Sequence, residues 1–308
     1  MLLVVFALVI SAACERPESA EATAEVAVTP VDQEVDWAAV DVAMGRSGTL
    51  QDGGVYRFGM PRTDLSVTSE GVQIRTSLAL GSWVGMVPAG ANEVVAMGDV
   101  VLTDDELNPV LARLQEGGVG QAAIHKHLLE HSPEVWWTHV RARGNAVELA
   151  ETFRAALELT GTPAEGAAEG ETAPELTIDT AQISEILGHD GRDNSGVYSI
   201  GVPRTETIRS MGIEVPPSMG ISTALNFQPT GEGTAAVNGD FAMIADEVDR
   251  VVAALRQNEI EVASIHNHLT DEEPRLLFLH FWAEGDAVEL ARGLRAALDE
   301  TNSQPGSR

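Results

Sequence analysis

The chain repeats itself once, and this duplication limits the possible folds more than any other feature of the sequence. Gly54-Val55-Tyr56 recurs as Gly196-Val197-Tyr198. Further matches follow at a constant offset: Gly98-Asp99 with Gly239-Asp240, His125-Lys126-His127 with His266-Asn267-His268, and His139 with His280. A repeat unit of about 125 residues has the usual size of a domain. The sequence therefore predicts two tandem modules of the same fold, over residues 35–160 and 177–301, followed by a short tail at 302–308.

Each module contains patterns of both strands and helices. In the first copy, helices are expected over 37–44, after Thr103 and after Asn145, and strands over 55–60, 83–87, 94–101, 119–128 and 135–141. Thr103 and Glu106 have the spacing of a capping box, which marks the start of a helix. The order helix, strand, strand, helix at the end of the module favours an α+β fold. We expect an antiparallel sheet with helices packed on it in each module.

The N-terminal segment is typical of an export signal. Residues 2–13 are apolar apart from Ser11, too few to span a bilayer but sufficient for a signal-peptide core. Small residues precede Cys14, which is the only cysteine of the chain and would be lipidated if the segment is a lipobox. Ordinary secretion with cleavage after Ala13 and a cytoplasmic location remain alternatives, because Ser11 stands where Leu is usual and no basic residue comes first. The segment 1–14 is thus predicted to be a signal peptide.

This segment predicts an exported protein, anchored by lipid on the outer side of the cytoplasmic membrane or held in the periplasm or cell envelope. Residues 15–34 and 161–176, rich in Ala, Glu, Pro and Gly, are expected to be a tether and an interdomain linker. The formal net charge of −28 repels phosphate backbones and anionic lipids. No nucleic-acid partner is therefore expected, and membrane contact is expected only through the N-terminal lipid.

Six of the eight histidines occupy matched positions, His125, His127 and His139 in the first copy and His266, His268 and His280 in the second. In a strand, His-x-His places two imidazoles on one face. The next strand returns through a turn near residues 271–273, which sets His280 opposite Ser264 or His266. Three neutral imidazoles are the ligand set of an open zinc, iron or copper site. The sequence therefore predicts a divalent-metal site in the second copy and a weaker one in the first.

Other residues suggest a bound ligand near these histidines. The turn of the second copy offers Asp271, Glu272 and Glu273, whereas the first copy offers only Glu130 and Glu134. The candidate ligand-binding residues of the second copy are Arg204, Arg275, Glu273 and Asp240. Two structural alternatives stay open. Arg62 and Arg204 would form ion pairs in so acidic a chain, and the histidines would hydrogen-bond to Asp99 or Asp240 in a core without metal.

The motifs of residues 196–287 resemble a known bacterial family. Gly-Val-Tyr, Pro-Arg-Thr, Gly-Asp, His-Asn-His-Leu, Glu-Pro-Arg-Leu, His-Phe-Trp and Gly-Asp-Ala are similar to the LppY/LpqO-type lipoprotein family, which is built on a domain of unknown function. The resemblance covers both modules and implies export. It implies no particular reaction.

Two functional hypotheses follow from the sequence. In the first, the chain binds a divalent metal or a small ligand, and a metal-bound water would serve as the nucleophile of a hydrolase-like enzyme. In the second, it is a non-catalytic envelope binding or scaffolding protein with structural histidines and no cofactor. A third hypothesis is a pH-responsive module, because clustered imidazoles titrate near neutral pH.

Overall fold

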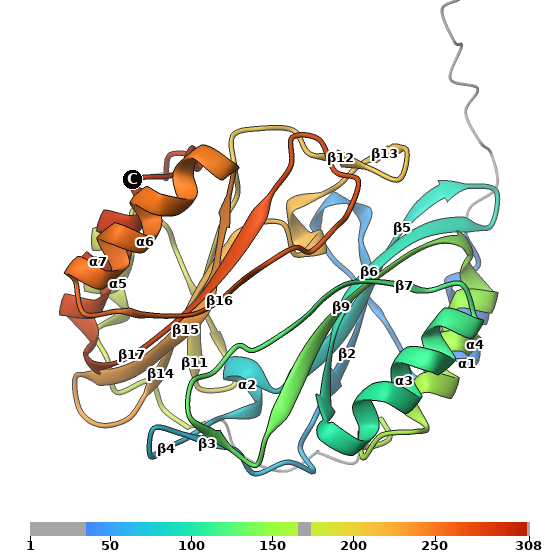
Figure 1. The fold of residues 1–308 in the computed structure, drawn as a ribbon, viewed down its shortest axis with the longest axis horizontal. Coiled ribbons are helices and arrows are strands. Elements are labelled where there is room, and N and C mark those ends of the chain that lie inside the picture. The colour runs from blue at the N-terminus through green and yellow to red at the C-terminus, as the bar shows by residue number, and fades with distance from the viewer. Residues whose placement is uncertain (1–34, 166–173, 307–308) are drawn as a thin grey trace, which may run out of the picture. The chain divides into compact units, whose positions relative to one another are not determined.

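Two six-stranded antiparallel sheets, one in each module, form the framework of the fold (Figure 1). The computed structural model describes residues 35–165 and 174–306, so the predicted signal peptide, Cys14, the tether and part of the predicted linker lie outside the described residues. The first sheet has the order β1 (Thr49–Leu50), β2 (Tyr56–Pro61), β5 (Gly81–Gly90), β6 (Glu93–Thr103), β9 (Val135–Asn145), β7 (Gly120–His125). The second has the order β10 (Arg192–Asn194), β11 (Val197–Val202), β14 (Thr223–Pro229), β15 (Thr234–Met243), β17 (Leu277–Asp286), β16 (Glu261–His266).

Short elements complete each module. The first contains α2 (Thr76–Ala79), the 3-10 turn η1 (Asp52–Gly54) and the small strands β3 (Thr68–Ser69), β4 (Val72–Gln73) and β8 (His131–Ser132). The second contains the 3-10 turns η2 (Pro217–Met219) and η3 (Ala245–Glu247), and the strands β12 (Arg209–Ser210) and β13 (Ile213–Glu214).

Three longer helices cover one face of each sheet. They are α1 (Trp37–Met44), α3 (Asp104–Glu116) and α4 (Ala146–Leu157) in the first module, and α5 (Thr180–Leu187), α6 (Val248–Gln257) and α7 (Ala287–Leu298) in the second (Figure 1). Alternate residues of β6 point to this face and pack in the same core cluster as Leu149 and Phe153 of α4. The corresponding core of the second module joins β15 and β17 to α6 and α7.

Local sequence signals set the starts of these helices. The carboxylate of Glu106 accepts a hydrogen bond from the backbone N–H of Thr103 at 2.9 Å, as the capping-box spacing predicts. The side chain of Asn145 accepts from the N–H groups of Val147 and Glu148, and Asp286 does the same for α7.

The second face of each sheet packs mainly against the other module instead of against the longer helices. Trp137 of β9 and Trp282 of β17 belong to one buried apolar cluster, and Met97 of β6 and Phe278 of β17 belong to another. Hydrogen bonds join the modules as well, including Asn238 Nδ2 to the His127 carbonyl at 2.7 Å and Ser264 Oγ to the Lys126 carbonyl at 2.8 Å. The two open sheet faces thus form a shared interior.

The predicted fold class is confirmed, since each module is a mixed α+β unit with an antiparallel sheet. The predicted strand ends differ in one place that matters. The strand expected over 119–128 ends at His125, and its match in the second module ends at His266. His127 and His268 therefore lie on the loops that follow these strands. Among the described residues, no helix is long and apolar enough to cross a membrane.

Candidate metal centre

The six matched histidines gather in the shared interior between the two sheets. His139 and His280 lie on β9 and β17, while the other four come from the ends of β7 and β16 and the loops beyond. The rings of His125 and His266 stack with centroids 3.8 Å apart. His127 packs on His280, and His139 on His268, each with centroids 3.7 Å apart. Where the sequence suggested a separate triad in each copy, the structure combines both triads into one group. We call these six residues, with Asp99 and Asp240, the histidine cluster.

The Gly-Asp pair of each module contacts the third histidine of that module, His139 in the first and His280 in the second. Asp99 is the direct cross-strand neighbour of His139, and Asp240 that of His280. His280 is set opposite Ser264 on its other side, one of the two pairings expected. A carbonyl can only accept a hydrogen bond, so His139 donates from Nδ1 to Gly98 at 3.3 Å and His280 from Nδ1 to Gly239 at 2.7 Å.

Three imidazole nitrogens converge at the centre of the cluster. The Nε2 atom of His266 lies 3.2 Å from Nε2 of His139 and 3.1 Å from Nε2 of His268. In the first module, Nε2 of His125 and Nε2 of His127 are 3.0 Å apart. Nitrogen ligands of a tetrahedral zinc ion, at bonds of about 2.05 Å, lie about 3.3 Å from one another. The spacing of the nitrogens is therefore close to that of a metal ligand set.

Burial keeps the imidazoles in the neutral form that binds metals. Loss of water is the largest cause that lowers the pKa of His139 to about 3 and of His268 to about 4, and it lowers the pKa of the other four cluster histidines too. Burial also raises the pKa of Asp240 to about 6. Neutral histidine and ionised carboxylate are the forms that coordinate a cation.

Several buried polar atoms of the cluster have no hydrogen-bond partner among the described residues. They are Nδ1 of His125, Nδ1 of His266, Nε2 of His280, Oδ1 of Asp99 and Oδ1 of Asp240. An unpaired buried polar atom costs about 1–3 kcal/mol, so such a concentration in one place fits a site that receives a ligand.

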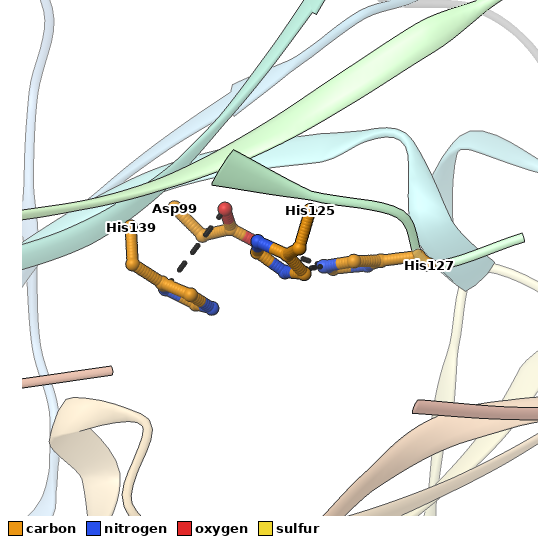
Figure 2. Close-up of side chains that lie close together, drawn as sticks. All are labelled: Asp99, His125, His127 and His139. Carbon is orange, nitrogen blue, oxygen red and sulfur yellow. Dashed lines mark hydrogen bonds and ion pairs between the residues drawn. The ribbon is translucent and has the colours of Figure 1, made fainter. Parts of the chain in front are cut away.

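Three groups of donors lie close enough together to hold an ion, with ligand atoms within 4.8 Å of one another. One group, shown in Figure 2, is Asp99 with His125, His127 and His139. The second is His125 with His266 and His280, and the third is His139 with His266 and His268. The second and third groups each take donors from both modules.

Comparison with protein families connects this site to the repeat. Residues 38–159 and residues 181–300 each match the model of the Domain of Unknown Function (DUF1259). The chain belongs to the DUF1259 family. The two matches confirm the tandem duplication and place one complete set of cluster residues in each DUF1259 copy.

Other comparisons add little to this family assignment. No curated protein matches the chain. One solved structure, the double ringed trimeric shell protein MSM0271 from the RMM microcompartment, is similar at 13% identity with a TM-score of 0.19, covering 72% of this chain and 88% of that one. A similarity of this size supports no conclusion about the DUF1259 modules.

Arg204, a candidate ligand-binding residue, does not belong to the histidine cluster. Its guanidinium is buried and uses all five N–H donors within the second DUF1259 module, on Glu206, Glu247 and the Ala242 carbonyl. Arg62 makes the matching contacts in the first module with Asp64, Glu106 and the Val101 carbonyl. These contacts are those of the structural ion pairs, the alternative expected for both arginines.

The carboxylates of the turn do not reach the histidine cluster either. Asp271 accepts from Ser210 and Met211, and Glu272 from the Leu276 N–H. Glu273 is exposed and pairs through its backbone with Arg209, while exposed Arg275 donates to the Thr270 carbonyl. Of the four candidate ligand-binding residues, only Asp240 lies in the cluster, because it comes from a central strand.

Residues that the sequence did not single out complete the site. The Gly220 carbonyl accepts from Nδ1 of His268 at 2.6 Å. Trp137 stacks on His127 with centroids 4.5 Å apart, and Phe278 stacks on His268 at 3.5 Å. A backbone carbonyl leaves no mark in the sequence, so the Gly220 contact could not be predicted. Trp137 and Phe278 stand two residues before the third histidine of their module, a strand spacing that places both rings on one face.

Proposed function

We propose that this protein binds a divalent transition metal in the histidine cluster. The observation that carries the proposal is the convergence of the Nε2 atoms of His139, His266 and His268 at 3.1–3.2 Å. Imidazole with carboxylate suits zinc, iron or copper. Such an ion would supply Lewis-acid chemistry and, with an open position, an activated water.

The tautomers of the converging histidines support a cation between them. His139 and His268 donate from Nδ1 to backbone carbonyls at 3.3 and 2.6 Å, so their Nε2 atoms carry lone pairs. Both lone pairs face the single Nε2 of His266, which has at most one proton to offer. One N–H cannot donate well to two acceptors in different directions, whereas a metal ion accepts all three lone pairs.

The carboxylate next to these histidines supports the same conclusion. Oδ2 of Asp240 lies 3.4 Å from Nε2 of His268, the nitrogen that carries a lone pair. A lone pair and an acceptor oxygen repel each other in a buried site unless a proton or a cation lies close to both. The first module has the matching approach, with Oδ2 of Asp99 at 3.2 Å from Nε2 of His127.

Metal content tests the proposal directly. The full chain is expressed without a histidine tag, purified without chelators and analysed by elemental mass spectrometry. We expect at least one equivalent of zinc, iron or copper per chain, reduced in His266→Asn and unchanged in His189→Asn, a histidine outside the cluster. A chain that holds no metal, and takes up none when the three ions are added, would contradict the proposal and favour the structural-histidine alternative.

We also propose that the protein is exported and anchored through a lipid on Cys14, where it would meet a small ligand or an envelope component. The apolar run of residues 2–13 before a lone cysteine and the resemblance to LppY/LpqO-type lipoproteins support this. Cell fractionation tests it. The chain is expected in the membrane fraction, and Cys14→Ser is expected to release it. Recovery of both forms in the cytoplasm would rule out export.

A further inference from the structure

The third histidine of each module presents its two nitrogens to different modules. His139 directs Nδ1 to the Gly98 carbonyl of its own module and Nε2 to Nε2 of His266 in the other. His280 directs Nδ1 to its own Gly239 carbonyl at 2.7 Å. Its Nε2 has no hydrogen-bond partner among the described residues, and the histidine shares a donor group with His125 of the first module and His266 of its own.

The ring contacts of the third histidines also cross from one module to the other. His139 packs on His268, and His280 packs on His127, with centroids 3.7 Å apart in both cases. Each third histidine thus lies against the second histidine of the other module's His-x-His pair. The two arrangements are equivalent under the repeat, since His125, His127 and His139 match His266, His268 and His280.

We infer that the cluster holds two metal ions, each bound by the His-x-His pair of one module and the third histidine of the other. One centre consists of His266, His268 and His139, and the other of His125, His127 and His280. This inference rests on the proposed metal binding and extends it: each ion would take its histidines from both modules.

The donor group within the first module, Asp99 with His125, His127 and His139, differs from the exchanged centres in the nitrogen that His139 turns toward Asp99. His139 approaches Asp99 through Nδ1, at 3.9 Å from Oδ1, and this nitrogen already donates to Gly98. The nitrogen that is free to bind a metal is Nε2, which faces the second module. A complete set of Nε2 ligands therefore requires the exchange of the third histidine. Asp99 and Asp240 remain beside the His-x-His pairs, at 3.2 and 3.4 Å from His127 and His268.

Zinc binding by combined variants distinguishes exchanged ligands from self-contained modules. In the background H266N/H268N, one centre is destroyed and the chain should bind one zinc ion where the unmodified chain binds two. Adding H280N should abolish this remaining zinc, and adding H139N should leave it. Self-contained modules predict the reverse, because His139 would then belong with His125 and His127. The zinc content is measured by elemental mass spectrometry after equilibration with zinc and dialysis.

The reciprocal background provides the matched control. In H125N/H127N, adding H139N should abolish the remaining zinc and adding H280N should leave it. Circular dichroism and a cooperative thermal transition show whether each variant is folded. If a background does not fold, anomalous diffraction at the zinc edge from crystals of the unmodified chain identifies the ligands of each ion directly.

The outcomes separate the two proposals. Two zinc ions with ligands from both modules support the exchange. A single ion per chain, or ions whose histidines all come from one module, overturns the exchange but leaves metal binding intact. A chain that takes up none of zinc, iron and copper in any form overturns both.

Discussion

At the scale of single residues, the glycine of each Gly-Asp pair is required by close packing between strands. A Cβ atom at Gly98 would collide with the carbonyl oxygen of Trp83, and one at Gly239 with the carbonyl oxygen of Ala224. The same glycines supply the carbonyls that orient His139 and His280. The repeated glycine therefore serves both the packing of the sheet and the position of an imidazole.

The close approach of the neighbouring strand at Gly239 predicts a loss of stability on adding one methyl group. Gly239→Ala should lower the free energy of unfolding by about 1–3 kcal/mol, because the strand must shift to relieve the overlap. Gly201→Ala is the matched control, since a Cβ at that strand position meets nothing within 4 Å. Urea denaturation of both variants measures the difference. Equal stabilities would show that the sheet accommodates the methyl group without strain.

The buried imidazoles predict how stability depends on pH. Their pKa values in the folded chain are lowered from 6.5, so below about pH 6.5 the unfolded chain binds protons that the folded chain does not. Stability should therefore fall as the pH falls, by about 1.4 kcal/mol per pH unit for each proton. Asp240 has its pKa raised to about 6 and therefore adds stability as the pH falls. This single group opposes six imidazoles, so the net effect is still a loss of stability.

Thermal unfolding of chelator-treated protein measures this effect. The Tm should be lower at pH 5 than at pH 7.5, and the difference should shrink in the variant H125N/H266N. An equal Tm at both pH values would mean that the cluster histidines are not buried as neutral rings.

At the scale of elements, each buried arginine follows an early strand of its module and forms hydrogen bonds with a later strand and with the start of the helical segment that comes after it. Arg204 follows β11 and binds the Ala242 carbonyl at the end of β15 as well as Glu247 of η3, at 2.8 and 2.7 Å. Burial lowers the pKa of Arg204, but hydrogen bonds to Glu247 and Glu206, together with their Coulomb attraction, hold it above its usual value. The contacts give the repeated Pro-Arg-Thr the same structural role in both modules.

Removal of this guanidinium is predicted to leave a buried carboxylate without its partner. Arg204→Gln should lower the free energy of unfolding by about 3–5 kcal/mol. Arg250→Gln, which breaks the exposed pair with Glu300, should cost less than about 1 kcal/mol. Guanidinium chloride denaturation compares the two variants. A cost for Arg204→Gln as small as that of the control would refute a structural role for the buried pair.

Local sequence signals predicted the helices well, because capping residues such as Thr103 and Asn145 act within one turn. They predicted the strand ends less well, since pairing across the sheet decides where a strand stops. The near-continuous apolar run of 94–102 did contain one further clue. Helices on one side of a sheet bury only alternate residues, so such a run indicates that the other face is buried as well.

At the scale of the whole molecule, the two modules share an interior that neither could cover alone. Trp137 with Trp282 and Met97 with Phe278 join the two sheet faces around the histidine cluster. The sequence predicted that the matched histidines of each copy converge, but it assigned each triad to its own copy. Contacts between domains are not encoded in local spacing, so this combination could not be read from the repeat.

The shared interior predicts that the modules stay together after the chain is cut. A protease site placed in the segment 161–174 should allow cleavage, and the two halves should still elute as one species in size-exclusion chromatography. The apolar clusters and the hydrogen bonds from Asn238 and Ser264 hold them. Separate elution of the halves under native conditions would contradict this arrangement.

Because the two modules are part of one chain, formation of the shared interior does not depend on the protein concentration. Two separate copies would meet only at a rate set by their concentration, and they would part on dilution. Modules joined by a short segment experience an effective concentration of about millimolar, whatever the number of molecules present. A site that needs histidines from both modules is then complete in every single chain, and its occupancy depends on the supply of the ligand alone.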